Sequence, residues 1–290
     1  MSFQPRAFVQ PDPGWEIGKY ALLNLRARVR AGRTEVDPVA RRIPYQWLGA
    51  HYQDHDDQPF VLLQNSSGGF VEGDTAALHL HMEPGARLLV TTASAAKFYK
   101  CEHGGQSEEI VDIDVADGAT LEYLPDEVIP YAASRTVRRT RIHMAAGARL
   151  FATDLIAAGR IHHRAGEAFA FHAMRSEFEV WLDGRLIVLD RLFARTPEQA
   201  RELEALWAGR QHLGMVVAYV SGMETGIEET LHEALAQYEG VTAGVSRIGD
   251  LVCVRLLAAE TWHAHAAVYG CWEVLRPAIA GKAARPIRKS

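Results

Sequence analysis

Acidic side chains at strand-like spacings are the first residues of this sequence that could do chemistry. Glu122, Asp126 and Glu127 fall within six residues of one apolar segment, and Asp154 lies in the next such segment. Side chains two positions apart lie on one face of a strand, so Glu122 shares its face with an apolar neighbour. An acid on such a face is either paired or functional, because an isolated buried charge is costly. The same argument applies to Arg160.

Histidines offer a second kind of chemistry, since His and carboxylate side chains suit borderline divalent metal ions. A His-x-His pair in a strand also places two imidazoles on one face. Such groups occur at four places: His51 with Asp54, His55, Asp56 and Asp57; His79 with His81; His162 with His163; and His263 with His265. The metal interpretation predicts a metal-dependent hydrolase. No third ligand follows any pair nearby, so the alternative is surface histidines and, around His51, a polar loop.

A glycine-rich loop raises the question of nucleotide binding. Residues 68–75 have the phosphate-loop spacing Gly-x4-Gly-x-Thr and contain Gly68, Gly69 and Gly73. Asp74 stands where a phosphate-binding lysine belongs, and a carboxylate there repels phosphate. The sequence therefore argues against a nucleotide site, and the glycines indicate a tight turn and the close approach of another element. Lys97 is a predicted ion-pair partner for a carboxylate such as Asp74 or Glu127.

The elements that must position these residues belong to a repeated unit. Residues 78–90, 111–123 and 141–151 each read as an alternating strand, a turn ending in Gly-Ala and a second apolar strand, and residues 178–188 form a weaker fourth copy. The turn glycines lie roughly 29 to 37 residues apart, a period typical of repeat architectures. The pairs Asp117-Gly118 and Asp183-Gly184 predict hairpin turns. We expect a mainly β scaffold of repeated strand-turn-strand units, either β-helix-like or made of stacked sheets.

The rest of the chain divides into strands before the repeats and a mixed region after them. Strands are expected over 20–29, 34–41 and 60–63, with an irregular segment over 43–57. A few helices are expected in the C-terminal third, over 197–207, 225–238 and 261–275, the last ended by Arg276-Pro277. The first has Leu203, Leu206 and Trp207 as its apolar stripe. Strands are expected over 212–220, 241–248 and 251–257.

We expect one domain over 1–290. It would comprise a loose arm over 1–13, the repeat scaffold over 14–195, an α/β part over 196–280 and a flexible basic tail over 281–290.

Composition excludes several classes of protein. With 48% hydrophobic and 23% charged residues, the chain has an ordinary globular composition. The net charge of −5 argues against a general nucleic-acid binder, and the basic runs 26–33 and 135–141 are interpreted as solvated strand faces. No segment is long and apolar enough to span a membrane, and none reads as a signal peptide. Three cysteines without a CxxC motif predict no disulfide framework, and we expect a cytoplasmic protein.

Three motifs in order resemble the family of urease accessory proteins called UreD or UreH. They are Gly68-Gly-Phe-Val-Glu-Gly-Asp74, then Thr91-Thr92 with Lys97-Phe-Tyr99, then Gly118-Ala with Leu121-Glu-Tyr-Leu-Pro-Asp-Glu-Val-Ile-Pro-Tyr131. Asp154 with Gly159-Arg160, and Trp272 with Leu275-Arg-Pro277, are similar to the family as well. The resemblance covers roughly residues 60–286.

The resemblance implies a role in nickel delivery and no enzymatic activity. Family members bind apo-urease and, through UreF, the GTPase UreG, and nickel is thought to pass to urease through an internal water-filled tunnel. The implied fold is β-helix-like, and nickel is a transient cargo. By motif the functional core includes Gly68, Gly69, Gly73, Asp74, Lys97, Glu122, Glu127, Asp154 and Arg160. We hypothesise that Glu122, Asp126, Glu127 and Asp154 lie near the nickel path, since scattered carboxylates hold a divalent ion weakly.

The sequence departs from the family pattern at several positions. The family tends to have Pro-Pro at Ser66-Ser67, Gly at Glu72 and Gln at Asp126, and usually carries Phe at Pro130-Tyr131. These departures bear on which side chains line the path. Two further interpretations compete with nickel delivery: a β scaffold that binds another protein without metal traffic, and the metal-dependent hydrolase.

Overall fold

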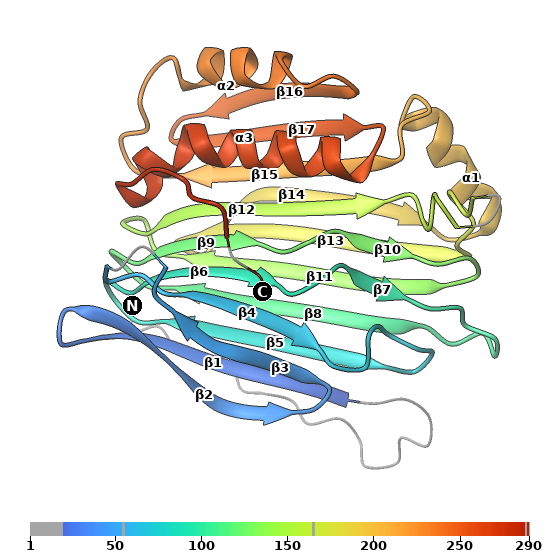
Figure 1. Ribbon diagram of the computed structural model, residues 1–290, viewed down its shortest axis with the longest axis horizontal. Helices are drawn as coiled ribbons and strands as arrows, with labels where there is room; N and C mark the ends of the chain where they lie inside the picture. The colour runs from blue at the N-terminus through green and yellow to red at the C-terminus, as the bar shows by residue number, and fades with distance from the viewer. Residues whose placement is uncertain (1–19, 54–55, 164–165, 288, 290) are drawn as a thin grey trace.

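Two β-sheets stacked face to face make up most of the protein. The computed structural model describes residues 20–53, 56–163, 166–287 and 289. Three helices are present in the described part of the chain, and two of them, α2 and α3, lie at the end of the molecule where β15, β16 and β17 run (Figure 1). The prediction of a mainly β fold with helices in the C-terminal third is confirmed, and the stacked-sheet form of it is the one observed.

The first sheet, sheet A, has seven strands and a parallel centre. Its order is β14 (Arg185–Ala194), β13 (Ala173–Leu182), β11 (Arg135–Met144), β8 (Ser107–Val115), β5 (Thr75–Met82), β1 (Tyr20–Arg30) and β2 (Arg33–Arg42). The strands from β13 to β1 pair in parallel, whereas β14 and β2 pair antiparallel at the two edges.

The second sheet, sheet B, has ten strands. Its main order is β16 (Val241–Ile248), β17 (Leu251–Ala258), β15 (His212–Tyr219), β12 (Arg149–Ala157), β9 (Thr120–Leu124), β6 (Arg87–Thr92), β4 (Phe60–Asn65) and β3 (Tyr45–His51). The short strands β7 (Ala96–Phe98) and β10 (Val128–Pro130) pair with each other, and β10 also pairs with β12. The strands β4, β6, β9 and β12 are parallel. Beyond β12, the strands β15, β17 and β16 extend the sheet through antiparallel pairs.

The first three sequence repeats each cross from sheet A to sheet B. The pairs β5–β6, β8–β9 and β11–β12 therefore lie in different sheets, so the prediction of a hairpin at Asp117-Gly118 is wrong. The turns stack on one another through backbone bonds such as Gly85 N to Asp117 O, at 3.2 Å. Gly85 and Gly118 have φ values of 73° and 69°, a left-handed conformation that favours glycine. Only the fourth repeat is a hairpin, β13–β14, as Asp183-Gly184 predicts.

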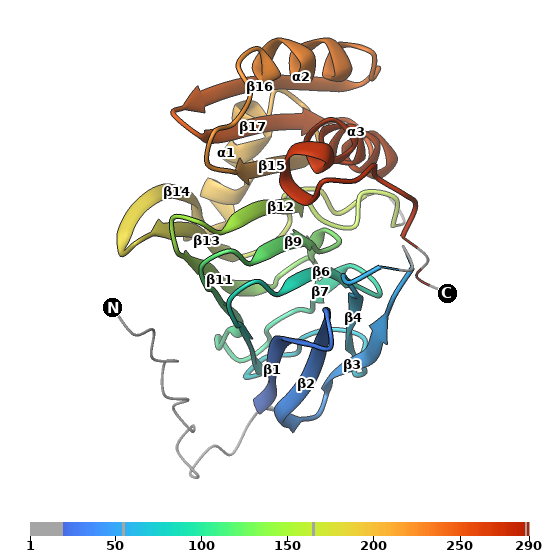
Figure 2. The same cartoon turned by 90° about the vertical axis from the view of Figure 1, so that its left-hand side faces the viewer.

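Side-chain alternation divides the core into two layers. One apolar cluster lies between the sheets and includes Leu23, Leu78, Ile113 and Leu150. The other lies between sheet B and the helices α2 (Ile227–Ala236) and α3 (Thr261–Ala280), and Trp272 is fully buried in it. Turned by 90°, the molecule shows α3 lying along the face of sheet B that is turned away from sheet A (Figure 2).

Three local predictions are wrong. The segment 43–57 contains the strand β3, whose register shifts between Trp47 and Ala50, and this bulge hides the alternation. Helix α1 (Pro197–Leu206) begins at its predicted Thr196 cap, but Leu206 is 73% exposed because the buried stripe runs through Ala200, Leu203 and Trp207. Helix α3 continues beyond Arg276-Pro277.

The extension of α3 has a tertiary cause. A proline inside a helix removes one backbone hydrogen bond. Here Ile279 and Ala280, after the proline, are 0% and 4% exposed, so the last turn is held by burial. Gly281, in the left-handed conformation, then ends the helix.

The proposed division of the chain into scaffold, α/β part and tail stays a prediction. The loose arm expected over 1–13 lies outside the described residues. Of the predicted tail, Ala284 and Ile287 contact the helix-side core, and Gln53 Nε2 donates to the backbone oxygen of Pro286.

Candidate functional site

Sheet B separates the four carboxylates of the predicted nickel path. Asp154 in β12 points toward sheet A, whereas Glu122 in β9 points toward α3. Just before β10, Asp126 pairs with Lys289 and Glu127 pairs with His265 of α3, so both carboxylates lie on the helix side as well. Three of the candidates therefore share one side of sheet B, and Asp154 lies alone on the other.

Asp154 belongs to an ionic group between the sheets, here called the inter-sheet cluster: Glu109, Arg138 and Asp154. Arg138 donates from Nη1 and Nη2 to Asp154 Oδ1, each at 3.1 Å, and from Nε to Glu109 Oε2 at 3.2 Å. Arg138 and Asp154 are only 5% and 7% exposed. One guanidinium between two carboxylates leaves the cluster with a net negative formal charge in a poorly solvated interior.

Hydroxyl groups complete the inter-sheet cluster without cancelling its charge. Tyr45 OH donates to Glu109 Oε1 at 2.7 Å, and Arg138 Nη1 donates to Ser176 Oγ at 3.1 Å. Burial, and next to it the charge of Glu109, raise the pKa of Tyr45 and of Tyr123 well above the usual tyrosine value, so both phenols stay neutral. Burial alone would lower the pKa of Arg138, but its two carboxylate partners raise it, so the guanidinium stays charged.

The space between the sheets is polar at one end and apolar at the other. At the end where β8 and β11 begin, Ser107, Ser134 and Thr136 are buried, and their hydroxyls have no hydrogen-bond partner in the described part of the chain. At the opposite end of the same strands the inner face carries Val115 and Met144. Buried hydroxyls of this kind are usually met by ordered water. The polar end could therefore hold water beside the inter-sheet cluster.

Glu122, on the other face of sheet B, is fully buried and fully bonded. Its Oε1 accepts from Trp272 Nε1 at 2.5 Å and from Arg276 Nε at 2.9 Å, and its Oε2 accepts from Gln58 Nε2 at 2.5 Å and from Arg276 Nη2 at 3.4 Å. Arg276 itself is 3% exposed. With both oxygens occupied by protein donors, the geometry gives Glu122 a role in holding α3 on sheet B.

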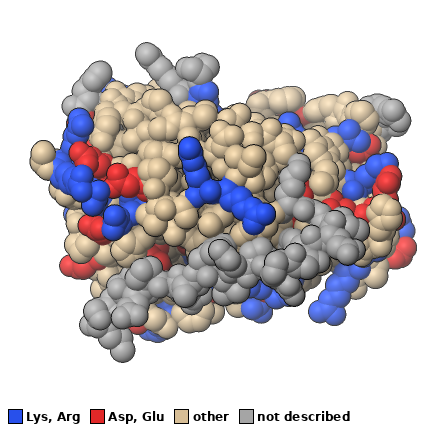
Figure 3. Space-filling model, turned by 90° about the horizontal axis from the view of Figure 1, so that it is seen from below, with Lys and Arg blue, Asp and Glu red and all other residues tan. Residues whose placement is uncertain are grey.

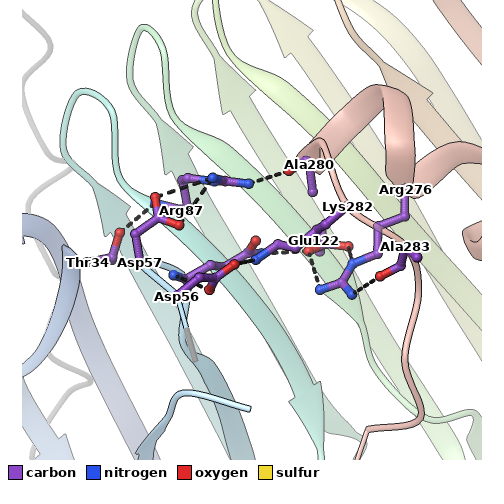
Figure 4. Close-up of polar contacts among 10 residues, drawn as sticks. Thr34, Asp56, Asp57, Arg87, Glu122, Arg276, Ala280, Lys282 and Ala283 are labelled. Atoms are coloured by element: carbon purple, nitrogen blue, oxygen red, sulfur yellow. Dashed lines mark hydrogen bonds and ion pairs between the residues drawn. The ribbon is translucent and has the colours of Figure 1, made fainter. Parts of the chain in front are cut away.

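Further ionic contacts fasten the end of α3 and the segment after it (Figure 4). Arg87 in β6 pairs with Asp57 at 3.2 Å and donates to the backbone oxygen of Ala280. Lys282 pairs with Asp56, and Arg276 Nη1 donates to the backbone oxygen of Ala283 at 2.7 Å. These contacts join the C-terminal segment to the loop before β4.

Glu127, which is buried, pairs with His265, whose side chain is 40% exposed. His265 Nε2 lies 2.7 Å from Glu127 Oε2, and the buried His212 lies close enough to influence both groups. Burial opposes ionisation of Glu127 most strongly, but the hydrogen bond from His265, a backbone hydrogen bond and the charges of His265 and His212 together lower the pKa of this carboxyl. The side-chain hydrogen bond with Glu127 raises the pKa of His265. Asp126 pairs with Lys289 next to it.

The glycine loop has the structural role that the sequence predicts. A Cβ atom on Gly69 would lie 2.7 Å from Lys97 O and 2.7 Å from the ring of Tyr99, so β7 approaches the loop too closely for a side chain. Gly68 and Gly73 have φ values of 78° and 83°. Asp74 is buried, and its Oδ2 accepts from Val71 N within the loop.

Lys97 and Arg160 lie apart from the carboxylates of the predicted path. No ion pair joins Lys97 to Asp74 or Glu127, all of which are described residues, so that predicted pairing is wrong; Glu127 pairs with His265 instead. Arg160 donates to both oxygens of Glu167, at 2.6 and 2.7 Å, and its guanidinium lies 4.1 Å from the ring centre of Tyr131.

The histidine groups do not converge. His79 and His81 lie on the outer face of sheet A, and burial lowers the pKa of each. His263 and His265 lie in a helix, where residues two apart point in different directions, so the expected shared face is absent. His55 and Asp54 lie outside the described residues. Within the described part of the chain, no three or more His, Cys, Asp or Glu side chains form a group that could hold a metal ion.

Sequence reasoning missed Arg138 and Glu109, and it grouped His265 with His263 rather than with its partner Glu127. The interpretation of residues 135–141 as a solvated face is wrong for Arg138, which is buried. The signal was available, because Arg138 has the same parity as Ile142 and Met144, whereas Arg139 and Arg141 have the opposite parity. His265 carried no comparable signal, since its partner is 138 residues away in sequence.

In the face seen from the β1–β2 end, basic side chains lie in the middle among uncharged ones, and acidic and basic side chains mix at both ends (Figure 3). Among the described residues, no helix has the length and apolar character needed to cross a membrane.

Comparison with known proteins identifies the family. The profile of the family described as UreD urease accessory protein matches residues 19–290. The chain is 30% identical to the urease accessory protein UreD of Pseudomonas fluorescens over 288 residues, 98% of each chain. It is 29% identical to UreD of Klebsiella aerogenes over 269 residues, covering 93% of this chain and 94% of the relative. UreD of Lachnoclostridium phytofermentans is 28% identical over 256 residues, covering 88% and 92%. The chain therefore belongs to the UreD family of urease accessory proteins.

Proposed function

We propose that this protein takes part in urease maturation by passing nickel to apo-urease along a polar path between its two sheets. It would act as a non-enzymatic accessory protein, together with UreF and, through UreF, the GTPase UreG. Nickel would be a transient cargo. The general role in urease maturation follows from family membership; the path and the partners are the proposal.

One observation carries the proposal: a net negative ionic cluster lies beside buried hydroxyls in the space between the sheets. Among the described residues, Asp154 and Glu109 share one cation, Arg138. A carboxylate-rich, hydrated interior attracts a divalent cation, while carboxylate ligands hold nickel less tightly than a cage of histidines or cysteines would. The arrangement suits transit better than storage.

The contacts of the candidate carboxylates support testing some of them before others. Glu122 is engaged by Trp272, Arg276 and Gln58 and serves α3, so we place it outside the path. Asp126 and Glu127 lie on the helix side, where they stay candidates for an entrance or exit. Asp154, with Glu109, is the first choice.

The test compares urease activation with complex formation. The urease subunits and the other accessory proteins are co-expressed with this chain, which is tagged, and both co-purification with apo-urease and urease activity are measured. The variant replaces the whole cluster, Glu109→Gln, Arg138→Met and Asp154→Asn, because removing a buried ionic group together avoids an unpaired charge. We expect the variant to bind apo-urease as the wild type does and to lose most of the activation.

A matched control breaks an ion pair on the outer face of sheet A. Asp112 is 8% exposed, close to the 7% of Asp154, and pairs with Arg141 at 2.6 Å. Asp112→Asn with Arg141→Met should leave activation unchanged. Normal activation by the cluster variant would contradict the path and favour the competing interpretation of a β scaffold that binds its partners without metal traffic.

A further inference from the structure

A groove lined by arginines crosses the outer face of sheet A, the face turned away from sheet B. It has a volume of about 770 Å³ and lies where β11 and β13 begin and β14 ends. Its basic lining consists of Arg135, Arg139, Arg175, Arg191 and Arg195. Among the described residues, two carboxylates, Glu108 and Glu177, line it as well. We call this the arginine groove; it is separate from the inter-sheet cluster and takes no part in the proposed path.

The described lining of the groove has more arginines than carboxylates to pair with them. Glu177, which is 4% exposed, accepts from Arg139, Arg175 and Arg191 at 3.1 to 3.3 Å. Arg175 and Arg191 keep about half of their side chains exposed, at 50% and 48%. Neither Arg135 nor Arg195 forms an ion pair with any described residue. The groove therefore presents fixed guanidinium groups with donors left over for an anionic partner.

One wall of the groove is held in place by a carboxylate. Glu72 accepts hydrogen bonds from the backbone N–H groups of Glu102, His103 and Gly105, and so fixes the loop that contributes Gly104 and Gly105 to the lining. A Cβ atom on Gly105 would lie 2.8 Å from Glu72 Oε1, so this glycine lets the loop close over the carboxylate. The wall is ordered before any partner arrives.

An apolar shoulder continues the groove toward α1. Phe193 lines both the arginine groove and a smaller adjoining hollow that includes Arg195, Leu203 and Leu206. Phe193 is 41% and Leu206 73% exposed. Large apolar side chains exposed beside a charged groove are typical of a protein-binding surface.

We propose that the arginine groove binds an acidic protein segment that carries a large apolar side chain. The carboxylates of the segment would pair with Arg135, Arg195 and the spare donors of Arg175 and Arg191, and its apolar side chain would cover Phe193 and Leu206. The commitment to a peptide rests on this combination of charge and apolar surface. Nucleic acid would need a broader basic surface than a chain of net charge −5 with one local groove offers.

The test uses the full chain and a fluorescein-labelled peptide of alternating Glu and Ser with one central Phe. Binding is followed by fluorescence anisotropy at low and at high salt. The variant Arg135→Glu with Arg195→Glu reverses the two arginines without ion pairs, so the Glu177 network stays intact. We expect this variant to bind at least about tenfold more weakly, with affinity falling as salt rises. Should the double reversal reduce folding, Arg135→Gln with Arg195→Gln gives the same comparison at smaller charge change.

The matched control is Arg185→Glu, which makes a charge reversal at the exposed opposite end of β14. It should retain wild-type affinity. Equal binding by the double variant, or an equal loss in Arg185→Glu, would overturn the proposal. Tighter binding of a single-stranded oligonucleotide, displacement by inorganic phosphate, or a dimer that the double variant dissolves would each assign the groove to another occupant and overturn it as well.

A second variant tests the apolar shoulder by itself. Leu206→Ser should weaken binding of the Phe-containing peptide about threefold to fivefold and leave a Phe-free peptide of the same charge unaffected. An equal effect on both peptides would contradict the proposed contact between Leu206 and the apolar side chain of the segment. Because these assays contain neither nickel nor urease, their outcome is independent of the proposed nickel path.

Discussion

Two groups of buried charges in this protein differ in how completely hydrogen-bond donors satisfy their carboxylates. Glu122 receives four hydrogen bonds from three side chains, so its charge is fully matched by donors. Between the sheets, Arg138 alone serves Glu109 and Asp154. A matched buried charge stabilises one arrangement, whereas an excess of carboxylates leaves capacity for a cation. The contacts therefore give Glu122 a structural role, whereas nickel transit past the inter-sheet cluster is what we propose.

The Glu122→Ala variant tests the structural assignment. It would remove the Glu122 carboxylate from the buried Arg276 and from Trp272 Nε1. We expect the free energy of unfolding to fall by about 3–5 kcal/mol, measured by urea denaturation. Glu198→Ala on α1 is the control, because Glu198 and its partner Arg201 are 68% and 64% exposed, and the loss there should be much smaller. Similar losses for the two variants would contradict the anchoring role.

The Glu127–His265 pair predicts a specific dependence of stability on pH. The pKa of His265 is raised from 6.5, so its contribution is full below pH 6.5 and is lost as pH rises through the folded value. The pKa of Glu127 is lowered from 4.5, so its contribution is full above pH 4.5 and is lost as pH falls through the folded value. The pair should therefore stabilise the fold most between these values.

The measurement compares the wild type with His265→Gln at a series of pH values. The difference in unfolding free energy should be largest near pH 5–6 and shrink toward both higher and lower pH. His212, Glu260, Asp126 and Lys289 surround the pair and are present in both proteins, so their own titration largely cancels. A difference that does not vary with pH would show that the pair contributes no ionic stabilisation.

At the scale of elements, the repeated unit is an arch between two sheets. Each turn of the first three repeats places its second strand in the opposite sheet. Stacking requires successive turns to pair through their backbones, as Gly85 N does with Asp117 O. The parallel ladders of both sheets follow from this repetition, because equivalent strands of successive repeats run the same way. The loop before β5 is also tightly packed, because Gly69 lies close to the backbone of Lys97.

The Gly69→Ala variant tests that close approach. The added methyl group would meet the backbone oxygen of Lys97 and the ring of Tyr99, each at 2.7 Å, and the backbone contact cannot move aside cheaply. We expect a loss of about 2 kcal/mol in the free energy of unfolding, from thermal or urea melts. Gly244→Ala, in the edge strand β16 with open space around it, should change stability by no more than about 1 kcal/mol. If both alanine variants are equally stable, the loop has room that the structure does not show.

At the scale of the whole molecule, the C-terminal segment closes the helix side of sheet B. Arg276 joins α3 to Glu122 in the sheet and to Ala283 after the helix, and Lys282 reaches Asp56 before β4. Ile287 adds apolar contact with the helix-side core. Segments far apart in the sequence are thus tied together at one place, which makes the end of the chain part of the fold.

Truncation after Gly281 tests this closing role. Loss of the segment exposes apolar surface around Trp272 and leaves Asp56 without Lys282, so we expect the melting temperature to fall by roughly 5 °C. Lys282→Gln with Lys289→Gln keeps the chain length and removes only the charges, and should cost much less. A truncated protein that melts with the wild type would return the segment to the status of a flexible tail.

The sequence by itself determined which residues form strands and which way most of them face. Alternation in residues 111–115 and the turn glycines at 85 and 118 predicted repeated strand units, because these patterns depend on local geometry. The cap at Thr196 and the hairpin at Asp183-Gly184 were equally local and are confirmed. The family was also within reach of the sequence, since its motifs are contiguous.

Only the tertiary structure decided which faces meet. Whether two strands of a repeat pair or arch depends on contacts with other repeats, so Asp117-Gly118 was misread as a hairpin. The separation of Glu122 from Asp154 depends on what covers each face of sheet B, and α3 lies more than 100 residues further along the chain. The same long-range packing determines that Asp154, Glu127 and Glu122 meet their partners, which are Arg138, His265 and Arg276. Local pattern fixes the direction of a side chain; the partner it meets is fixed by the stacking of the sheets and the docking of the last helix.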